Sequence, residues 1–463
     1  MVLLSILTLV GGGLILVPLG GRRGYRPVSI VLGVVSLLLS SLAMFVRWPI
    51  EIYPWIDFLG MRLALRVDGV SYIIALGTYL VLILVQIGVW HRRVLDSALD
   101  NGLALLMIGS LIGLYYSFDF ISFFIFFEVV LLASFFLPFL HGGSARVPSL
   151  RYFVLNNIGS MTLLVAIAIF FTETGTTYFP DIYELTRAGL MRTEPLTIAT
   201  ILVFFSFVFK AAVFPLSLWL PDYHAESPAP ITAFLAGAIL NAGAFGIIRY
   251  AQLIPFSEQV FLAVAVASTV SMFYGGLLAM AQSDLKRFLA YSSISQMGYI
   301  FLGVASGTQI GLIGAVIHTF SHSVGKSLLF SYSSQYSTGH IGINKLMGSA
   351  MKEFRPSMGL TVGALTLMGL PPTSGFIGEW MIFTGAFHAF PQIAAVAVFA
   401  VAVSAAYFMW LMYRVFNPEY RSEVECIPTT PYVVQTVASL VAVLFVGLFP
   451  FYFVDIIQTF GAF

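Results

Sequence analysis

Long apolar runs separated by short polar breaks follow one another along the whole chain. A run of about 20 apolar residues is long enough to cross a bilayer as a helix. The alternation of polar and apolar residues that marks a membrane β-barrel is missing, so we expect α-helices. Hydropathy predicts about 14 membrane-spanning helices. They lie near residues 2–18, 28–46, 70–90, 103–117, 120–140, 152–171, 198–220, 231–252, 259–280, 289–306, 309–333, 357–384, 391–414 and 432–455.

Composition supports an all-α integral membrane protein. Of the 463 residues, 59% are hydrophobic and 9% are charged, whereas soluble domains carry roughly 25% charge. Little room remains for a soluble domain, so residues 1–463 are expected to form a single transmembrane domain. A net charge of +1 without a basic tail argues against a nucleic-acid partner.

The chain has a single cysteine, Cys426, which excludes an internal disulfide and any all-cysteine metal or iron–sulfur site within it. The sequence also lacks a phosphate-binding loop, a GxGxxG turn, a Ser-His-Asp arrangement and a haem motif. We therefore expect no cofactor and no metal in this chain. Any redox chemistry would belong to another subunit.

Two of the predicted helices are interrupted by proline and glycine. The seventh breaks around Pro215, and the twelfth breaks around Pro371 and Pro372 in LMGLPPTSGFIGEW. Two interrupted hydrophobic segments in corresponding positions indicate an inverted-repeat transporter with sites near the bilayer midplane. We therefore predict two five-helix repeats with flanking helices. The predicted parts are helices 1–3 in residues 1–100, helices 4–8 in 101–255, helices 9–13 in 256–416 and helix 14 in 417–463.

The basic loop residues predict a topology. When alternate loops are assigned to two sides, 14 Lys and Arg residues, among them Arg26, Arg92 and Arg421, collect on one side and 6 on the other. Cytoplasmic loops are enriched in these residues. The N-terminal run lacks the basic start of a cleaved signal peptide, so it is expected to remain as the first span. We expect the chain in the cell (inner) membrane with both termini on the outer face.

Two ionisable residues lie deep in predicted spans of the first half. Glu128 is surrounded by Phe and Leu, and Lys210 by Phe, Val, Ala and Ser. A charge at the bilayer centre costs roughly 2.5–3.5 kcal/mol, so it usually faces a partner or water. We predict that the two residues form a pair that is switched when they move apart. A structural ion pair that only orients two helices is the alternative.

The predicted eleventh and twelfth helices carry further ionisable residues. His318, His322 and Lys326 are spaced four residues apart, which places them on one helix face and suits a proton relay. Zinc is not expected, because the glutamate of a HExxH site and a third ligand are missing. Glu379 follows the Pro-Pro break, where water could reach its carboxylate. Histidines bonded to backbone in a core, and a glutamate at an interface, are the alternatives.

Several polar residues lie closer to the ends of predicted spans. Ser292 and Gln296 give the predicted tenth helix a polar face that could carry water, and His224 and Lys286 are further candidates for a relay. Most residues near span ends could instead be anchors or loop pairs. The remaining members of this group are Asp119, Asp222, Glu226, Asp284 and Arg249.

A resemblance to a known family rests on four stretches, FKAAVFPLSLWLPDYHAESPAP, SDLKRFLAYSSISQMGY, HTFSHSVGKSLLF and LPPTSGFIGEW. Together they are similar to the antiporter-like membrane subunits of respiratory complex I, of Mrp-type cation/proton antiporters and of membrane-bound hydrogenase-like complexes. The resemblance implies 14 helices, two inverted repeats with broken helices 7 and 12, and a polar axis along the midplane. Its axis positions match Glu128, Lys210, His318, His322, Lys326 and Glu379.

Two positions, Glu379 and Asn241, help to compare this chain with particular types of subunit in the family. Many members have lysine at the position of Glu379, and glutamate there is more similar to complex I subunit M. Members often have a second lysine in the eighth helix, where this chain has Asn241, so water or a neighbouring group would have to bridge there. No long amphipathic extension follows the last predicted span. In this respect the chain is similar to an M- or D-type chain and unlike subunit L.

The resemblance implies a membrane subunit that translocates protons, with sodium coupling left open, in a multi-subunit respiratory or hydrogenase-like complex. A redox partner subunit would drive it, so this chain would be the ion-pumping subunit of an oxidoreductase complex. The implied partners are other membrane subunits, including sister antiporter-like subunits, together with peripheral redox subunits and bilayer lipid. The alternatives are a subunit of a Mrp-type Na+/H+ antiporter complex and a non-pumping structural subunit.

Overall fold

The computed structural model describes residues 1–463 except 57–60, 255–256, 421, 423, 427–429 and 462–463. Arg421, one of the predicted loop cations, lies outside the described residues. The first half contains a hairpin of β1 (Glu51–Ile56) and β2 (Met61–Leu65). Its helices are α1 (Val2–Leu16), α2 (Arg26–Phe45), α3 (Gly69–Gly88), α4 (Ala98–Tyr116), α5 (Phe120–Phe139), α6 (Arg146–Thr174), α7 (Phe179–Arg187), α8 (Thr193–Ala211), α9 (Leu220–Glu226) and α10 (Ala229–Leu253).

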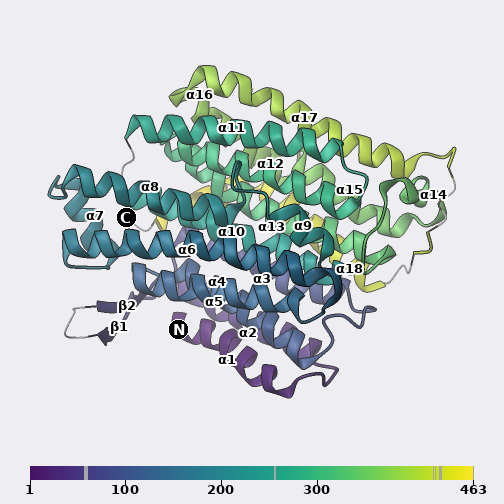
Figure 1. The fold of residues 1–463 in the computed structure, drawn as a ribbon, viewed down its shortest axis with the longest axis horizontal. Helices are drawn as coiled ribbons and strands as arrows, with labels where there is room; N and C mark the ends of the chain where they lie inside the picture. The colour runs from purple at the N-terminus through teal and green to yellow at the C-terminus, as the bar shows by residue number, and fades with distance from the viewer. Residues whose placement is uncertain (57–60, 255–256, 421, 423, 427–429, 462–463) are drawn as a thin grey trace.

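The second half continues the same helical bundle. Its helices are α11 (Glu258–Met280), α12 (Leu285–Ala305), α13 (Gln309–Tyr336), α14 (Ser349–Lys352), α15 (Phe354–Leu367), α16 (Ser374–Ala389), α17 (Pro391–Phe416), α18 (Thr430–Leu448) and α19 (Pro450–Thr459). The long helices run side by side, with α1 and α2 at one edge and α16 and α17 at the opposite edge (Figure 1). The prediction of an all-α membrane protein is confirmed.

Twelve helices within the described residues are long and apolar enough to cross a membrane. Helix α13 has 28 residues and would be about 42 Å long at 1.5 Å per residue. It is not one of these twelve, and it is almost wholly buried. The helices α15 and α16, with 14 and 16 residues, lie on either side of the second break. The count of 14 spans and the inverted relation of the two halves stay predictions.

Both predicted helix breaks are present. Helix α8 ends at Ala211, and Ala212 has a positive φ of 52°, after which the chain continues irregularly to α9. Helix α15 ends at Leu367, and α16 begins at Ser374. Proline explains both breaks, because it cannot donate a backbone hydrogen bond and disfavours helix in the residue before it.

The prediction of one continuous last span over 432–455 is wrong. Helix α18 ends at Leu448, and α19 begins at Pro450. Phe449, the residue before the proline, leaves the helical region with φ −123° and ψ 50°. Pro450 therefore interrupts this span, as prolines interrupt the two spans with predicted breaks. The apolar run nevertheless continues across Pro450.

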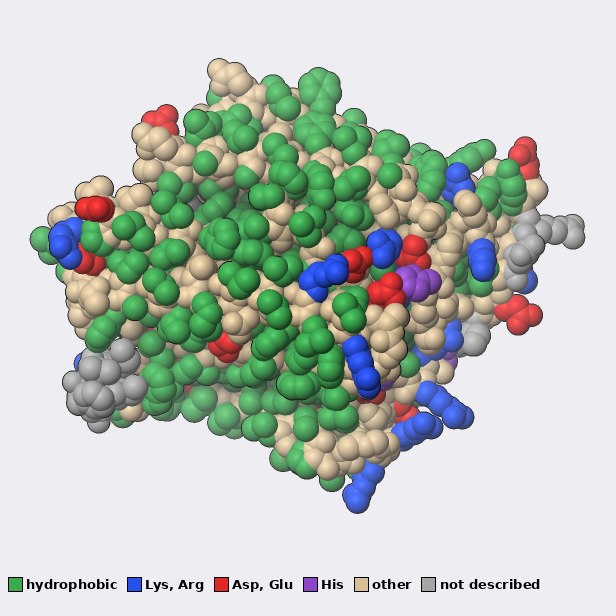
Figure 2. Space-filling view, in the orientation of Figure 1, with side chains coloured by type: hydrophobic (Ala, Val, Ile, Leu, Met, Phe, Trp, Pro, Cys, Tyr) green, Lys and Arg blue, Asp and Glu red, His purple; other side chains and the backbone are tan. Residues whose placement is uncertain are grey.

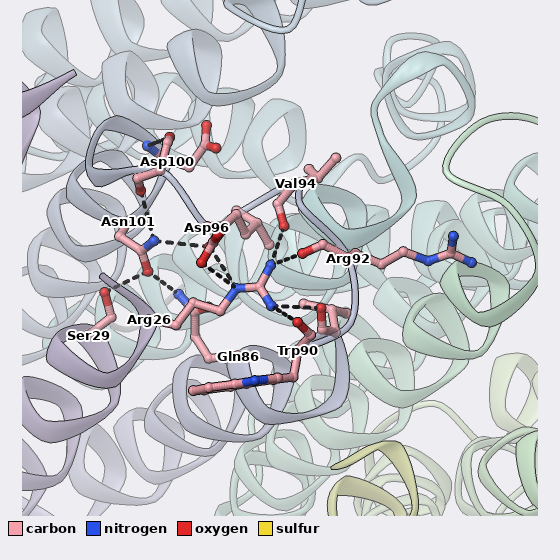
Figure 3. A network of polar contacts seen from close by, with 12 residues as sticks. Arg26, Ser29, Gln86, Trp90, Arg92, Val94, Asp96, Asp100 and Asn101 are labelled. Atoms are coloured by element: carbon pink, nitrogen blue, oxygen red, sulfur yellow. Dashed lines mark hydrogen bonds and ion pairs between the residues drawn. The ribbon is translucent and has the colours of Figure 1, made fainter. Parts of the chain in front are cut away.

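The connection between α3 and α4 is organised around Arg26, a residue that the sequence places in a basic loop. Its guanidinium is buried and donates hydrogen bonds to the carbonyl oxygens of Leu95 at 3.0 Å and Val94 at 2.7 Å (Figure 3). Arg92 of the same connection donates to the carbonyl oxygen of Ser334 in α13 at 2.7 Å. Together the two arginines tie the N-terminal helices to the centre of the bundle.

Helices α10 and α13 form the centre of the bundle, where close contacts require glycine. A Cβ atom at Gly237 of α10 would lie 2.9 Å from the carbonyl oxygen of Ser323 in α13. A Cβ atom at Gly378 of α16 would lie 2.9 Å from the backbone nitrogen of His318 in α13. Since such contacts leave no space for a side chain, these glycines bring α10 and α16 against the polar face of α13.

The surface fits a membrane environment. Figure 2 shows hydrophobic side chains over most of the middle of one face, with charged side chains gathered mainly toward the two ends of the helices. Val154 and Ile158 of α6 and Ile201 of α8 are among the exposed apolar residues. A continuous apolar band of this kind suits contact with lipid or with neighbouring membrane proteins. The chain is a multi-pass membrane protein.

Candidate functional site

Lys210 is buried in the last turn of α8, directly before the first break. Its Nζ atom donates a hydrogen bond to the Tyr152 hydroxyl of α6 at 3.0 Å. It also lies 5.2 Å from the ring centroid of Phe127 in α5 and 5.4 Å from that of Tyr152. The faces of the two rings favour a cation at this position.

The Tyr152 hydroxyl is held by a second group, because it lies 2.6 Å from the Ser134 hydroxyl of α5. The Tyr223 hydroxyl of α9 donates to the Ser134 carbonyl oxygen at 2.7 Å, and the rings of Tyr152 and Tyr223 stack at 4.4 Å. Four helices, α5, α6, α8 and α9, therefore fix the position of the Lys210 ammonium.

Glu128 of α5 is half-buried, and its Oε1 atom has no hydrogen-bond partner among the described residues. In the described part of the chain, no ion pair joins Glu128 to Lys210. The predicted pair is therefore not a direct contact in this structure, and the Tyr152 hydroxyl accepts from the ammonium instead. Glu128 is nevertheless close enough to act electrostatically on the Lys210 ammonium.

Asn241 of α10 lies between the two halves of the axis. Its Nδ2 atom donates to the Gly237 carbonyl oxygen at 3.0 Å and to the Ser323 hydroxyl of α13 at 2.7 Å. Its Oδ1 atom is buried and has no partner within the described residues. The amide thus supplies the predicted bridging position with one free acceptor that water could occupy.

Helix α13 carries a row of three ionisable side chains, His318, His322 and Lys326. This row is completely buried, and α12 supplies its polar contacts. Lys326 Nζ donates to the Ser292 hydroxyl at 2.5 Å and to the Leu289 carbonyl oxygen at 3.0 Å. His318 Nε2 lies 2.8 Å from Gln296 Oε1. The structure therefore places Ser292 and Gln296, from the predicted polar face of the tenth span, in contact with the row.

His322 stands between His318 and Lys326 on α13. Neither of its ring nitrogens has a hydrogen-bond partner among the side chains and backbone described. A buried polar atom without a partner costs about 1–3 kcal/mol unless water satisfies it. The middle of the row therefore has two nitrogens that can exchange protons with water.

Glu379 of α16 is 5% exposed, and its carboxylate packs against Gly369 in the second break. Its Oε1 atom has no partner in the described structure. Gln296 Nε2 donates at 3.0 Å to the carbonyl oxygen of Leu367, at the end of α15. The break therefore brings a free carboxylate oxygen and the amide that contacts His318 to the same region.

His224 and Lys286 are both buried, so the prediction that they lie near span ends does not make them solvent-exposed anchors. Lys286 Nζ donates to the Ser227 carbonyl oxygen at 2.7 Å. Neither ring nitrogen of His224 has a partner among the described residues. The loop-pair interpretation fits Asp222, which pairs with Arg151 and Arg287. Arg249 instead forms a buried ion pair with Asp68.

The two halves of this arrangement contain similar features. Each half has a buried cation, held by a hydroxyl of a neighbouring helix, and a carboxylate with one unpartnered oxygen. The described residues contain no group of three or more His, Cys, Asp or Glu side chains that could hold a metal ion. The groups that remain are suited to binding and releasing protons.

Comparison with known families decides the classification. Residues 117–404, more than half of the chain, match the family described as NADH:quinone oxidoreductase/Mrp antiporter, TM. The chain belongs to this family. The resemblance that the four sequence stretches indicate is thereby confirmed.

Individual members of this antiporter-like family align over most of their length. F(420)H(2) dehydrogenase subunit M of Methanosarcina mazei is 32% identical over 389 residues, which cover 81% of this chain and 77% of the relative. NADH-quinone oxidoreductase subunit M of Pseudomonas aeruginosa is 32% identical over 387 residues, which cover 80% and 75%. A chain of respiratory complex I from Thermus thermophilus superposes with a TM-score of 0.89 at 28% identity, covering 99% and 98%.

The sequence does not single out three further polar residues of the site, because uncharged residues do not stand out in apolar helices. They are Tyr152, Tyr223 and Ser323. One signal exists for Tyr152. It lies with Asn156 and Ser160 at four-residue spacing on the buried face of α6, and such a polar row marks the side of a helix that faces the bundle interior.

Replacing Tyr152 with phenylalanine keeps the ring but removes the hydroxyl that accepts from Lys210. A hydrogen bond to a charged group contributes about 1.5–3 kcal/mol, so we expect proton translocation by the assembled complex to fall about tenfold. Tyr413→Phe is the control, because Tyr413 is 67% exposed. Wild-type translocation by Tyr152→Phe would show that the hydroxyl does not position the lysine.

Proposed function

We propose that the chain is a proton-translocating membrane subunit of a multi-subunit respiratory or hydrogenase-like complex, driven by a redox partner subunit. The observation that carries the proposal is the series of buried and half-buried ionisable and polar groups through both halves of the bundle. It includes Glu128, Lys210, Asn241, His322, Lys326 and Glu379. Membership of the antiporter-like family and the two relatives named subunit M support it.

The first half would respond to changes in charge. Lys210 holds its proton on Nζ against the Tyr152 hydroxyl, while Glu128 has a free carboxylate oxygen nearby. Protonation of Glu128 removes a negative charge from the neighbourhood of the ammonium and so disfavours the protonated lysine. Lys210 then releases its proton toward Asn241, where the free amide oxygen can hold a bridging water.

The second half would pass the proton along α13. Gln296 Nε2 donates to the Leu367 carbonyl oxygen, which orients Gln296 Oε1 toward His318 Nε2. In neutral His318 the hydrogen therefore lies on Nε2, and Nδ1 is free to accept a proton. Glu379 lies at the end of this row beside the break, where its free oxygen can receive the proton.

The energy for pumping would come from other subunits. Moving one charge across a membrane costs about 2.3 kcal/mol for each 100 mV. The sequence has one cysteine and no recognised cofactor motif, so we assign the electron transfer to peripheral redox subunits. These would act on this chain electrostatically or through a conformational change.

The two breaks support contacts with neighbouring membrane subunits. Pro371 and Pro372 are exposed on one side, and Pro215 and Leu218 are exposed at the first break. Lipid cannot bond the backbone groups of an interrupted helix, so such segments are normally covered by protein or water. We infer that sister antiporter-like subunits cover them. The excess of basic residues on one side supports a cell-membrane location with both termini on the outer face.

Mass spectrometry of the complex purified through this chain tests the proposal. We expect redox subunits to copurify and substrate oxidation to drive proton uptake into vesicles without sodium. Antiporter subunits alone, with proton movement that requires sodium, would favour the Mrp-type alternative, which the family description also includes. An intact redox complex without proton translocation would favour a structural subunit.

A further inference from the structure

A cluster of three titratable side chains lies at the surface end of α9. His340, in the connection after α13, places Nε2 3.0 Å from Glu226 Oε2 and Nδ1 3.1 Å from Asp284 Oδ2. A neutral imidazole has only one N–H, so donating to both carboxylates requires the doubly protonated ring. The cluster can therefore bind one proton, which allows His340 to donate to both carboxylates, and release it again.

The surroundings keep this cluster polar and accessible. His340 is 49% exposed, whereas Glu226 is 19% exposed. Burial alone would raise the pKa of Glu226, but hydrogen bonds from Ser144 and His340 and the charges of His340 and Lys286 together lower it. Asp222 beside it pairs with Arg151 and Arg287. Figure 2 shows a compact patch of basic, acidic and histidine side chains at the margin of the hydrophobic surface.

A buried lysine lies directly beneath the cluster. Lys286 is two residues after Asp284, has no exposed surface, and donates to the carbonyl oxygen of Ser227, the residue after Glu226. The Leu289 carbonyl oxygen, one helical turn further along α12, accepts from Lys326 Nζ at 3.0 Å. The rise between Lys286 and Leu289 along α12 is roughly 4.5 Å, so the residue that carries one lysine and the carbonyl that accepts from the other lie about one turn apart.

His224 supplies the second observation. It is 1% exposed, and neither ring nitrogen has a partner among the described residues. Its ring centroid lies 5.1 Å from that of Phe330, which follows Lys326 by one turn on α13. Burial and the charges of Lys326 and Lys286 lower the pKa of His224 to about 3, so its ring is neutral. Water is the group that commonly satisfies buried nitrogens without protein partners.

We propose that Glu226, Asp284 and His340 form the mouth through which protons reach the α13 row by way of Lys286 and His224. A proton from bulk water binds at the cluster and moves inward through water. His224 accepts it on one ring nitrogen and releases a proton from the other toward Lys326, so no net charge remains on the ring. This inference rests on the proposed proton translocation and names its uptake site.

The experiment uses the assembled complex in proteoliposomes and measures the initial rate of proton uptake between pH 6 and pH 8. The test variant is Glu226→Gln/Asp284→Asn. The Asp284→Asn change keeps a side-chain oxygen for the cap that Asp284 gives to the Arg287 backbone nitrogen. Asp222→Asn is the matched control, because Asp222 is a neighbouring surface carboxylate outside the proposed mouth.

We expect the double variant to slow uptake about fivefold at pH 8 and less at pH 6, because collecting carboxylates matter most when protons are scarce. An added membrane-impermeant buffer should restore the rate, whereas it would not repair structural damage. Asp222→Asn should keep the wild-type profile. A wild-type pH profile in the double variant, or a loss of rate that buffer does not restore, would contradict the proposed uptake site.

A parallel measurement on Lys210→Met separates the two claims. If Lys210→Met pumps normally, the proposed function fails together with its uptake site. If Lys210→Met abolishes pumping while the double variant keeps the wild-type pH profile, only the mouth is wrong.

Discussion

Replacing Lys326 with methionine should reduce proton translocation by the assembled complex at least about tenfold. Lys326 has no exposed surface, and its ammonium bonds to Ser292 and Leu289 of α12. Methionine fills a similar volume but cannot hold a proton, so the row on α13 would lose its cationic end. A tenfold loss corresponds to about 1.4 kcal/mol. The measurement is the ratio of protons moved to substrate oxidised in proteoliposomes.

Lys352→Met is the matched control for Lys326→Met, because Lys352 is an exposed lysine of α14. We expect it to pump at the wild-type rate. Equal pumping by both variants would show that the buried lysine is a packing residue and would remove the α13 row from the proposed route.

Replacing Asp68 with alanine should destabilise the chain more than any change to a surface ion pair. Arg249 Nη2 lies 2.5 Å from Asp68 Oδ2, and the two side chains are 2% and 0% exposed. Removing one partner of a buried pair leaves an uncompensated charge and costs about 3–5 kcal/mol. Asp68 also caps α3 by accepting from the Ser71 backbone nitrogen at 3.0 Å, and loss of a cap costs about 1 kcal/mol.

Thermal unfolding of the purified complex in detergent measures this effect. Glu353→Gln is the control, since it breaks the exposed pair of Glu353 with Arg355, and such pairs contribute about 0–1 kcal/mol. We expect a large fall in the unfolding temperature for Asp68→Ala and almost none for Glu353→Gln. Similar temperatures for the two variants would contradict a stabilising role for the buried pair.

The sequence predicts the spans and two of the breaks well, because both depend on local properties. Apolar length sets a membrane helix, and Pro215, Pro371 and Pro372 interrupt helices wherever they occur. The interruption before Pro450 follows the same rule. Hydropathy does not reveal it, because a single proline near the end of a long apolar run changes the average very little.

The side-chain partners could not be predicted, because they depend on how helices pack. Hydropathy places Glu128 and Lys210 at membrane depth, but the charges alone suggest a direct pair. In the structure, Lys210 donates a hydrogen bond to the Tyr152 hydroxyl and makes no ion pair with Glu128 within the described residues. In the same way, the sequence predicts that Arg26 is a basic residue of a loop. In the structure its side chain is buried among carbonyl oxygens of the connection between α3 and α4 (Figure 3).

The helical periodicity gives more information in the second half. Four-residue spacing places His318, His322 and Lys326 on one face of α13, and Ser292 and Gln296 on the facing side of α12. Both sets could be predicted because the period of a helix is fixed. The cluster around His340 could not be predicted, since its members come from separate connections.

The most direct test of the account is proton translocation by the assembled complex carrying Glu128→Gln and Lys210→Met. Both residues belong to the first half of the proposed route, and both substitutions preserve side-chain size while removing the charge. We expect the ratio of protons moved to substrate oxidised to fall to about a tenth of the wild-type value or less, with the complex fully assembled. An unchanged ratio in the assembled double variant would contradict proton translocation through this chain.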